Sequence, residues 1–156
     1  MTLTLRRPTA DEYQAWSALE LEGYISEIVA SGSLSRAAAE DQARREDAEL
    51  LPHGLDTPGQ LIFRLEAEGK PVGWLWLALQ HPHGDHGVGF IYNIVVDESF
   101  RGRGYGREAM ELAEEEAKRH GLHALALNVF GHNRIAWDLY LSLGYRETSV
   151  RMKKDL

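Results

Sequence analysis

The order of apolar and polar residues in the first third of the chain predicts a short strand followed by two helices. Residues 2–6 alternate between polar and apolar side chains, which is typical of a strand with one buried face. Apolar side chains then recur at helical spacing from Tyr13 to Ile28, and a charge-rich helical stretch follows over residues 35–51. Thr9 or Asp11 is expected to cap the first of these helices, because both side chains can accept a hydrogen bond from a free backbone N–H.

The remainder of the chain predicts alternating strands and helices. Residues 61–65 and 72–79 flank the turn Glu68-Gly69-Lys70 and form a predicted hairpin, with Trp74 and Trp76 on one face. A central strand from Phe90 to Val96 is followed by a long helix over residues 105–120. We expect three further elements, a strand at 125–129, a helix at 133–143, and a last strand at 145–152 that closes the sheet. At 156 residues, the chain is expected to form one α/β domain spanning residues 1–156.

The turn between the central strand and the long helix combines glycine with arginine. No acid lies between residues 99 and 107, although the chain as a whole carries a net charge of −7. Glycine lets backbone N–H groups approach a ligand closely, and the start of a helix attracts anions. The turn therefore predicts a pyrophosphate site made of Arg101, Gly102, Arg103, Gly104, Tyr105, Gly106 and Arg107.

Two familiar phosphate-binding motifs fit this turn poorly. A nucleotide-binding P-loop would need Gly-Lys-Ser or Gly-Lys-Thr, which is absent. Residues 104–109 do match the dinucleotide pattern G-x-G-x-x-A. That pattern also calls for an acid at the end of the next strand, and residues 127–131 contain none. A dinucleotide is therefore disfavoured as the ligand.

Two sequence blocks together resemble a known family. Arg101-x-x-Gly104-x-Gly106 is similar to the acetyl-CoA pyrophosphate loop of the GNAT superfamily of N-acetyltransferases. Residues 127–145, with an N-x-x-A…L-Y…L-G-Y pattern, are similar to the strand and helix that follow in that family. The resemblance implies a mixed, mostly antiparallel central sheet with one splayed parallel strand pair, flanked by helices.

The resemblance also implies an activity, the transfer of an acetyl group from acetyl-CoA to a primary amine in a ternary complex. The pantetheine arm would pair with backbone groups of residues 94–96, and Tyr140 would protonate the departing thiolate. Asn133 would reach the cofactor arm, although it could equally cap the last helix. The residues expected to bind the cofactor outside the loop are Ile94, Val95, Val96 and Asn133.

The general base is where the chain departs from the family pattern. Many members carry a glutamate on the central strand, where this chain has Tyr92 and Asn93. Asn93 is expected to position a water instead, and Glu22 on the first helix is the base that we name. Glu20, Glu27, His86 or a water remain open as bases; Tyr24, Tyr92 and Asn128 are expected to contact the acceptor.

Composition narrows the remaining choices. The chain contains no cysteine, which excludes disulfides, a thiolate metal site and a cysteine nucleophile. Its acidic balance disfavours nucleic-acid binding, and no apolar run is long enough to span a membrane, so we expect a cytoplasmic protein. The loop at residues 81–87 is rich in histidine, but Pro82 and Gly84 interrupt it and no bound metal is expected.

Several alternatives stay open at this point. The acceptor could be a small-molecule amine or a peptide N-terminus, and the donor could carry a longer acyl chain. A non-catalytic sensor that binds acyl-CoA would retain the same loop and need no base. The resemblance also allows a homodimer, since members of the family often pair.

Overall fold

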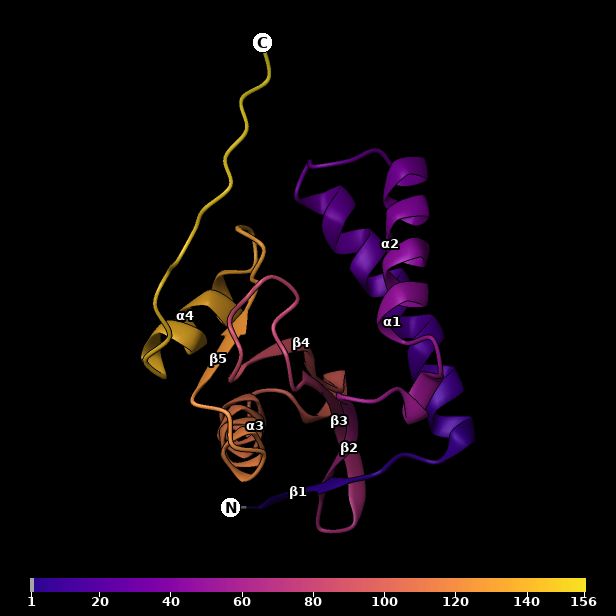
Figure 1. Cartoon of the computed structure of the whole chain (residues 1–156), viewed down its shortest axis with the longest axis vertical. Helices are drawn as coiled ribbons and strands as arrows, with labels where there is room; N and C mark the ends of the chain where they lie inside the picture. Colours follow the sequence, from indigo (N-terminus) through magenta and orange to yellow (C-terminus); the bar gives the residue numbers. More distant parts are fainter. Residues whose placement is uncertain (1) are drawn as a thin grey trace.

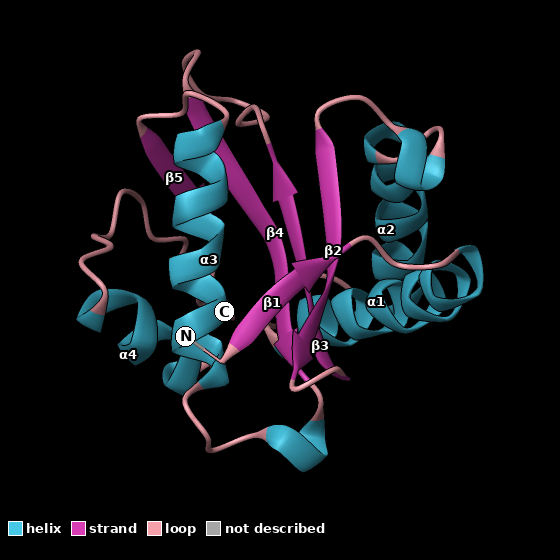
Figure 2. Ribbon diagram, turned by 90° about the horizontal axis from the view of Figure 1, so that it is seen from below, coloured by secondary structure: helices cyan, strands magenta, loops and turns pink. Residues whose placement is uncertain are grey.

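A five-stranded sheet organises the computed structural model, which describes residues 2–156 (Figures 1 and 2). The strands lie side by side in chain order. Neighbours pair antiparallel from the first strand to the fourth, and the last pair is parallel. This arrangement confirms the predicted fold class. The strands are β1 (Leu3–Arg6), β2 (Gln60–Ala67), β3 (Lys70–Ala78), β4 (Val88–Val96) and β5 (Ala124–Leu127).

Helices cover both faces of the sheet, as Figure 2 shows. Two lie between the first and second strands of the chain, and two lie on either side of the last strand. Their starts agree with the predictions to within a few residues. The four helices are α1 (Ala10–Ala30), α2 (Arg36–Leu50), α3 (Tyr105–Arg119) and α4 (Arg134–Ser142), and two short 3₁₀ helices are η1 (Gly54–Asp56) and η2 (Glu98–Phe100).

Each face of the sheet has its own apolar core because side chains alternate along β3. Leu75 and Leu77 point to the α3 face, where they join Met110 in a fully buried cluster. Trp74 and Trp76 point to the opposite face and surround Trp16 of α1. The predicted orientation of the two tryptophans is therefore confirmed, and the sheet separates the two clusters.

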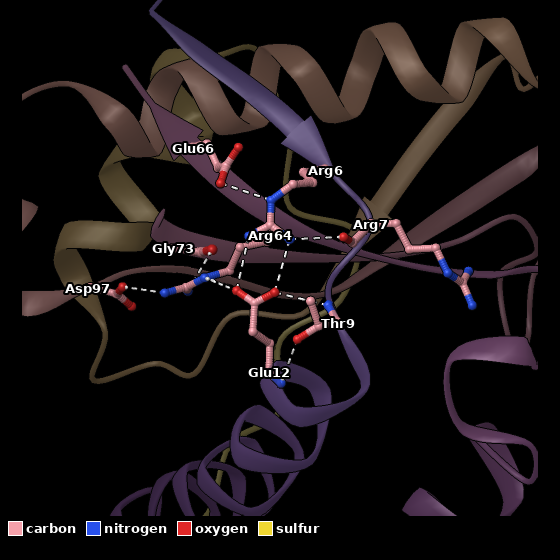
Figure 3. A network of polar contacts seen from close by, with 8 residues as sticks. All are labelled: Arg6, Arg7, Thr9, Glu12, Arg64, Glu66, Gly73 and Asp97. Atoms are coloured by element: carbon pink, nitrogen blue, oxygen red, sulfur yellow. Dashed lines mark hydrogen bonds and ion pairs between the residues drawn. The ribbon is translucent and has the colours of Figure 1, made fainter. Parts of the chain in front are cut away.

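Charged side chains tie the start of α1 to the sheet (Figure 3). Thr9 caps the helix, and its backbone N–H donates to Glu12 at 2.9 Å to complete a capping box. Arg6 of β1 donates to both Glu12 and Glu66, at 2.9 and 2.8 Å. Arg64 of β2 extends the network across the sheet to Asp97, at 3.2 Å. This network fixes the angle at which α1 leaves β1; Thr9, rather than Asp11, is the cap.

An extra residue in β4 distorts the sheet at its centre. Trp76 of β3 pairs with Asn93, but the next residue, Leu77, pairs with Ile91, so Tyr92 has no direct partner. A bulge of this kind bends the strand and increases its twist. β5 follows β4 only over residues 88–91, and the two parallel strands are not paired beyond that point.

The last predicted strand is wrong. Residues 145–156 form neither strand nor helix, and all of them except Tyr145 are exposed. A strand needs hydrogen bonds from a neighbour, and Figure 1 shows this segment running away from β5 beyond α4. Lys153 near its end donates to the carbonyl oxygen of Gly32, in the turn between α1 and α2, at 2.9 Å.

Among residues 2–156, none of the helices combines the length and the apolar character that crossing a bilayer would require.

Candidate active site

The glycine-rich turn leads directly into the start of α3, where backbone N–H groups are free within the helix. Gly104 adopts a left-handed conformation with φ of 83°, which only glycine reaches without strain, and it serves as the helix N-cap. The first hydrogen bond of the helix runs from the Glu108 N–H to the Gly104 carbonyl oxygen, at 3.2 Å. The N–H groups of residues 104–107 consequently have no partner within the helix. They supply donors and partial positive charge for an anionic ligand.

Three arginines surround this turn, and all are exposed. The Arg101 Nε donates to the Val96 carbonyl oxygen at 3.0 Å, which ties the turn to the end of β4. The Arg103 guanidinium lies over the Phe100 ring, at 5.4 Å from its centre. Arg107 donates to the Ser142 hydroxyl of α4 at 2.7 Å. The sequence prediction of a positive, glycine-lined turn therefore matches the local geometry.

The splay of β4 from β5 opens a strip of backbone beside this turn. Residues 94–96 pair with β3 along one edge, and β5 does not reach their other edge. Their side chains are half-buried, so backbone groups rather than side chains are presented along this edge. An extended ligand arm could pair there while its phosphate end rests on α3.

Helix α4, which follows β5 in the chain, has Asn133 as its N-cap and carries Tyr140 in its last turn. The Ala136 N–H donates to the Asn133 Oδ1 at 3.3 Å, so Asn133 does cap the helix. Tyr140 is half-buried against the α3-side core, and burial raises the pKa of its phenol. A raised pKa keeps the hydroxyl protonated at neutral pH, which is the form that a proton donor needs.

The bulge in β4 brings Tyr92 and Asn93 to the α1 face. The Tyr92 ring stacks on Trp76, with 4.6 Å between ring centres. The Asn93 Oδ1 is buried and has no hydrogen-bond partner among the described residues. A buried amide oxygen without a partner is costly, so this atom calls for a water or a ligand donor.

Acidic side chains line the space between α1 and α2. Burial, reinforced by the nearby Asp47, raises the pKa of Glu20 to about 7. The Tyr24 hydroxyl donates to Glu46 at 2.8 Å. Burial and then the negative charge of Glu46 raise the pKa of Tyr92 on β4. The helix pair thus presents negative charge and a carboxylate that titrates near neutrality.

Other predicted site residues lie apart from this group. Glu22 is exposed, and both of its oxygens accept from Arg36 at 2.8 Å. Glu27 is paired with His132 at 2.6 Å, and Asn128 is exposed just after β5. In the described part of the chain, histidine, aspartate and glutamate side chains nowhere gather in a group of three that could hold a metal ion.

The sequence pointed to Glu22 as the general base and left Glu20 only as an open alternative. The signal that separates them is helical spacing, since Glu20 lies four residues after Trp16 and four before Tyr24. It therefore shares the inward stripe of α1, whereas Glu22 falls off it. Nothing in the pattern of apolar residues predicts the bulge at Tyr92.

Comparisons with known proteins identify N-acetyltransferases as relatives over most of the chain. A sequence profile described as the acetyltransferase (GNAT) family matches residues 22–145. The uncharacterised N-acetyltransferase YdgE of Bacillus subtilis strain 168 is 31% identical over 159 aligned residues, which cover 100% of this chain and 99% of YdgE. YycN, also described as an uncharacterised N-acetyltransferase of that strain, is 32% identical over 157 residues and is covered in full.

Two solved structures extend the comparison. The crystal structure of YycN superposes with a TM-score of 0.91 and covers 99% of both chains. The aminoglycoside N-acetyltransferase AAC(6')-Iy, solved in complex with CoA, has a TM-score of 0.63 at 18% identity, covering 99% of this chain and 94% of its own. At that identity, the second likeness establishes a shared fold.

Proposed function

The chain belongs to the GNAT family of acetyltransferases, and from that premise we propose that it transfers the acetyl group of acetyl-CoA to a primary amine. The observation that carries the proposal is the open backbone strip of β4 beside the unpaired N–H groups of α3. Acetyl-CoA needs both features side by side, an open strand edge for its pantetheine arm and backbone donors for its pyrophosphate. In this proposal, residues 1–156 form one catalytic domain.

The donor would lie along the splay between β4 and β5. Residues 101–107 would bind its pyrophosphate through backbone N–H groups, with Arg101, Arg103 and Arg107 adding formal charge. Residues 94–96 would pair with the amides of the pantetheine arm. Asn133, at the start of α4, would contact the arm from the other side.

The acceptor would enter from the α1–α2 side of the sheet. A protonated amine is attracted to the acidic group of Glu20, Glu46 and Asp47, and Tyr24 and Tyr92 would line the same space. Both a small-molecule amine and a peptide N-terminus meet these requirements. Asn128, exposed after β5, would contact only an acceptor that extends past the sheet edge.

The proton transfers follow from the same placement. The amine must lose a proton before it attacks the thioester carbonyl, and Glu20 would accept it, directly or through a water held by Asn93. We favour Glu20 over Glu22 because Arg36 already neutralises Glu22. Collapse of the tetrahedral intermediate breaks the C–S bond, and Tyr140 would give its proton to the departing thiolate.

Calorimetric titration with acetyl-CoA tests donor binding, with dephospho-CoA and NAD as comparison ligands. We expect micromolar affinity for acetyl-CoA and no response to NAD. Release of CoA in the presence of a panel of amines then tests turnover, and propionyl-CoA tests tolerance for a longer acyl chain. Absence of acetyl-CoA binding would remove the basis of the proposal.

The variant Tyr140→Phe separates an enzyme from an acyl-CoA sensor. We expect kcat to fall by about 10²- to 10⁴-fold with unchanged acetyl-CoA affinity, because only the proton donor is lost. Tyr145→Phe is the matched control. Tyr145 lies beside Tyr140, with 6.2 Å between ring centres, and the substitution removes a phenolic hydroxyl from the same core. Equal turnover in the two variants would contradict the role of Tyr140.

A further inference from the structure

We propose that His132 is a positioning residue, which holds the helix that would bind the amine against the segment that would bind acetyl-CoA. The imidazole Nε2 of His132 lies 2.6 Å from the Glu27 Oε2, a contact between residues 105 positions apart in the chain. We call residues 128–133, which connect β5 to α4, the bridging segment. The inference rests on the function proposed above and adds a residue that would act through its neighbours.

The bridging segment leaves the sheet at the point where the two parallel strands part. Leu127, the last residue of β5, forms the last pair with β4, opposite Ile91. The chain then reaches across to α1 before it enters α4 (Figure 1). The segment therefore borders the opening in which the backbone strip at residues 94–96 and the acceptor space would meet.

Two contacts anchor the bridging segment on the helix pair. The Phe130 ring packs against a buried cluster from α1 and α2, and it stacks on the His132 ring with 5.8 Å between ring centres. The Asn133 N–H donates to the Phe130 carbonyl oxygen at 2.9 Å, which closes a turn before α4. The segment is thus fixed at α1 by Phe130 and His132 and at α4 by Asn133. The residues of the buried cluster are Ile25, Ile28, Ala39 and Ala43.

The residue that His132 contacts belongs to the stripe of α1 that would line the acceptor space. Glu20, Tyr24 and Glu27 are spaced by four and three residues, so their side chains lie along one face of the helix. Glu20 is largely buried, and the Tyr24 hydroxyl donates to Glu46 of α2. His132 therefore holds the end of the stripe that carries the proposed base.

On its other side, His132 directly precedes the residue that would contact the donor. Asn133 caps α4, and none of the nine residues described for that helix is fully buried. The placement of α4 therefore depends strongly on contacts at its ends, with the bridging segment at one end and the hydrogen bond from Arg107 to Ser142 at the other. Reacting groups must approach to about 3–3.5 Å, and a misplacement of about 1 Å can lower a rate about a hundredfold. A contact that joins the two binding sides can thus affect turnover without touching either substrate.

The pair of His132 and Glu27 is not expected to matter for overall stability. Its side chains are 38% and 44% exposed, and ion pairs with this exposure contribute little to folding. Substitutions at His132 should therefore leave the protein folded, and their effect should appear in the kinetics. A purely structural role would leave the KM for the amine unchanged.

Steady-state kinetics with the most active amine of the panel test the inference. We expect His132→Ala to raise the KM for the amine about 3- to 10-fold, the loss typical of one hydrogen bond, with unchanged acetyl-CoA affinity by calorimetry. His132→Gln should restore most of the loss, because a glutamine can place an N–H donor near the position of the imidazole Nε2. His120→Ala is the matched control and should behave as the unaltered protein, since His120 is 37% exposed and pairs with Glu116 of its own helix.

A double-mutant cycle tests whether the two partners act together. Glu27→Ala should match His132→Ala, and the double variant should lose no more than either, because all three remove the same contact. Hydrogen exchange of residues 128–133 should be faster in these variants than in the unaltered protein, even without turnover. An unchanged KM for the amine in His132→Ala, additive losses, or weaker acetyl-CoA binding would overturn this inference alone. Failure of the unaltered protein to release CoA with any amine would overturn the proposed function as well.

Discussion

Glu20 and Glu22 are two residues apart on α1 and have opposite surroundings. At about 3.6 residues per turn, a step of two moves a side chain to the far side of a helix. Glu20 is therefore largely buried near Asp47, toward the end of α2, while Glu22 is exposed and pairs with Arg36, the first residue of α2. The pKa of Glu20 is raised to about 7, which suits a base that works near neutral pH.

Replacing Glu20 by glutamine should change the pH profile of the reaction. In the unaltered protein, kcat/KM should rise as pH passes through about 7, where Glu20 loses its proton. Glu20→Gln should lose this rise and at least tenfold in kcat/KM above pH 7, whereas Glu22→Gln should keep both. A Glu20→Gln enzyme with an unchanged profile would exclude Glu20 as the base.

The same substitution should raise the stability of the protein at high pH, although it lowers kcat/KM. Folding raises the pKa of Glu20 from its usual 4.5, so the folded protein holds this proton more tightly than the unfolded chain. Stability is therefore lost as pH rises from about 4.5 to 7, and Glu20→Gln should be more stable than the parent at pH 8. Urea unfolding at pH 4 and pH 8 measures the difference.

Gly73 of β3 is a residue beside which the sheet has no room for a side chain. A Cβ there would clash with the Val95 carbonyl oxygen of β4, an atom that cannot move without shifting the strand. Gly73→Ala should cost about 1–3 kcal/mol of stability and weaken acetyl-CoA binding, since Val95 belongs to the proposed binding strip. Gly23→Ala in α1 is the control, because a Cβ there meets nothing within 4 Å and should be neutral or stabilising. Thermal unfolding and calorimetry of both variants would check this.

A local sequence pattern predicts the placement of some residues, such as the glycines in the turn before α3. The role of Tyr140 rests on such a pattern too, and it stays a prediction. The burial of Glu20 and the unpaired Oδ1 of Asn93 depend on α2 and on the bulge in β4, which are contacts between distant parts of the chain. A single sequence carries no direct record of those contacts.

Elements were predictable to the extent that each satisfies its own hydrogen bonds or has a neighbour within the chain. The helices begin close to where caps and apolar spacing place them, as with Thr9 for α1 and Ser35 for α2. Residues 145–152 have strand character but no neighbour in the single chain. Their pattern predicts a preference for strand, but in the structure the segment runs away from β5, whose outer edge could pair with it.

The junction of β1 and α1 should show a pH-dependent contribution to stability (Figure 3). Hydrogen bonds from Arg6 and then from Thr9 lower the pKa of Glu12 to about 2. Because the folded pKa is depressed, this contribution is fully present above about pH 4.5 and is lost as pH falls toward 2. Glu12→Gln should therefore lower the urea midpoint at pH 7, and the gap to the parent should narrow from pH 4 to pH 3. An equal gap at every pH would contradict this assignment, and Glu49→Gln on the exposed side of α2 should show no gap.

The sheet keeps the Trp16 cluster on one face separate from the Met110 cluster on the other. If the amine enters over α1 and α2 while α3 and β4 hold the donor, substitutions that reshape the acceptor space leave the packing beneath the CoA loop untouched. Mutational libraries confined to the α1–α2 face would then search for new substrates at little risk to donor binding. The same partition would let natural relatives diverge in what they acetylate while continuing to draw on a common acetyl donor.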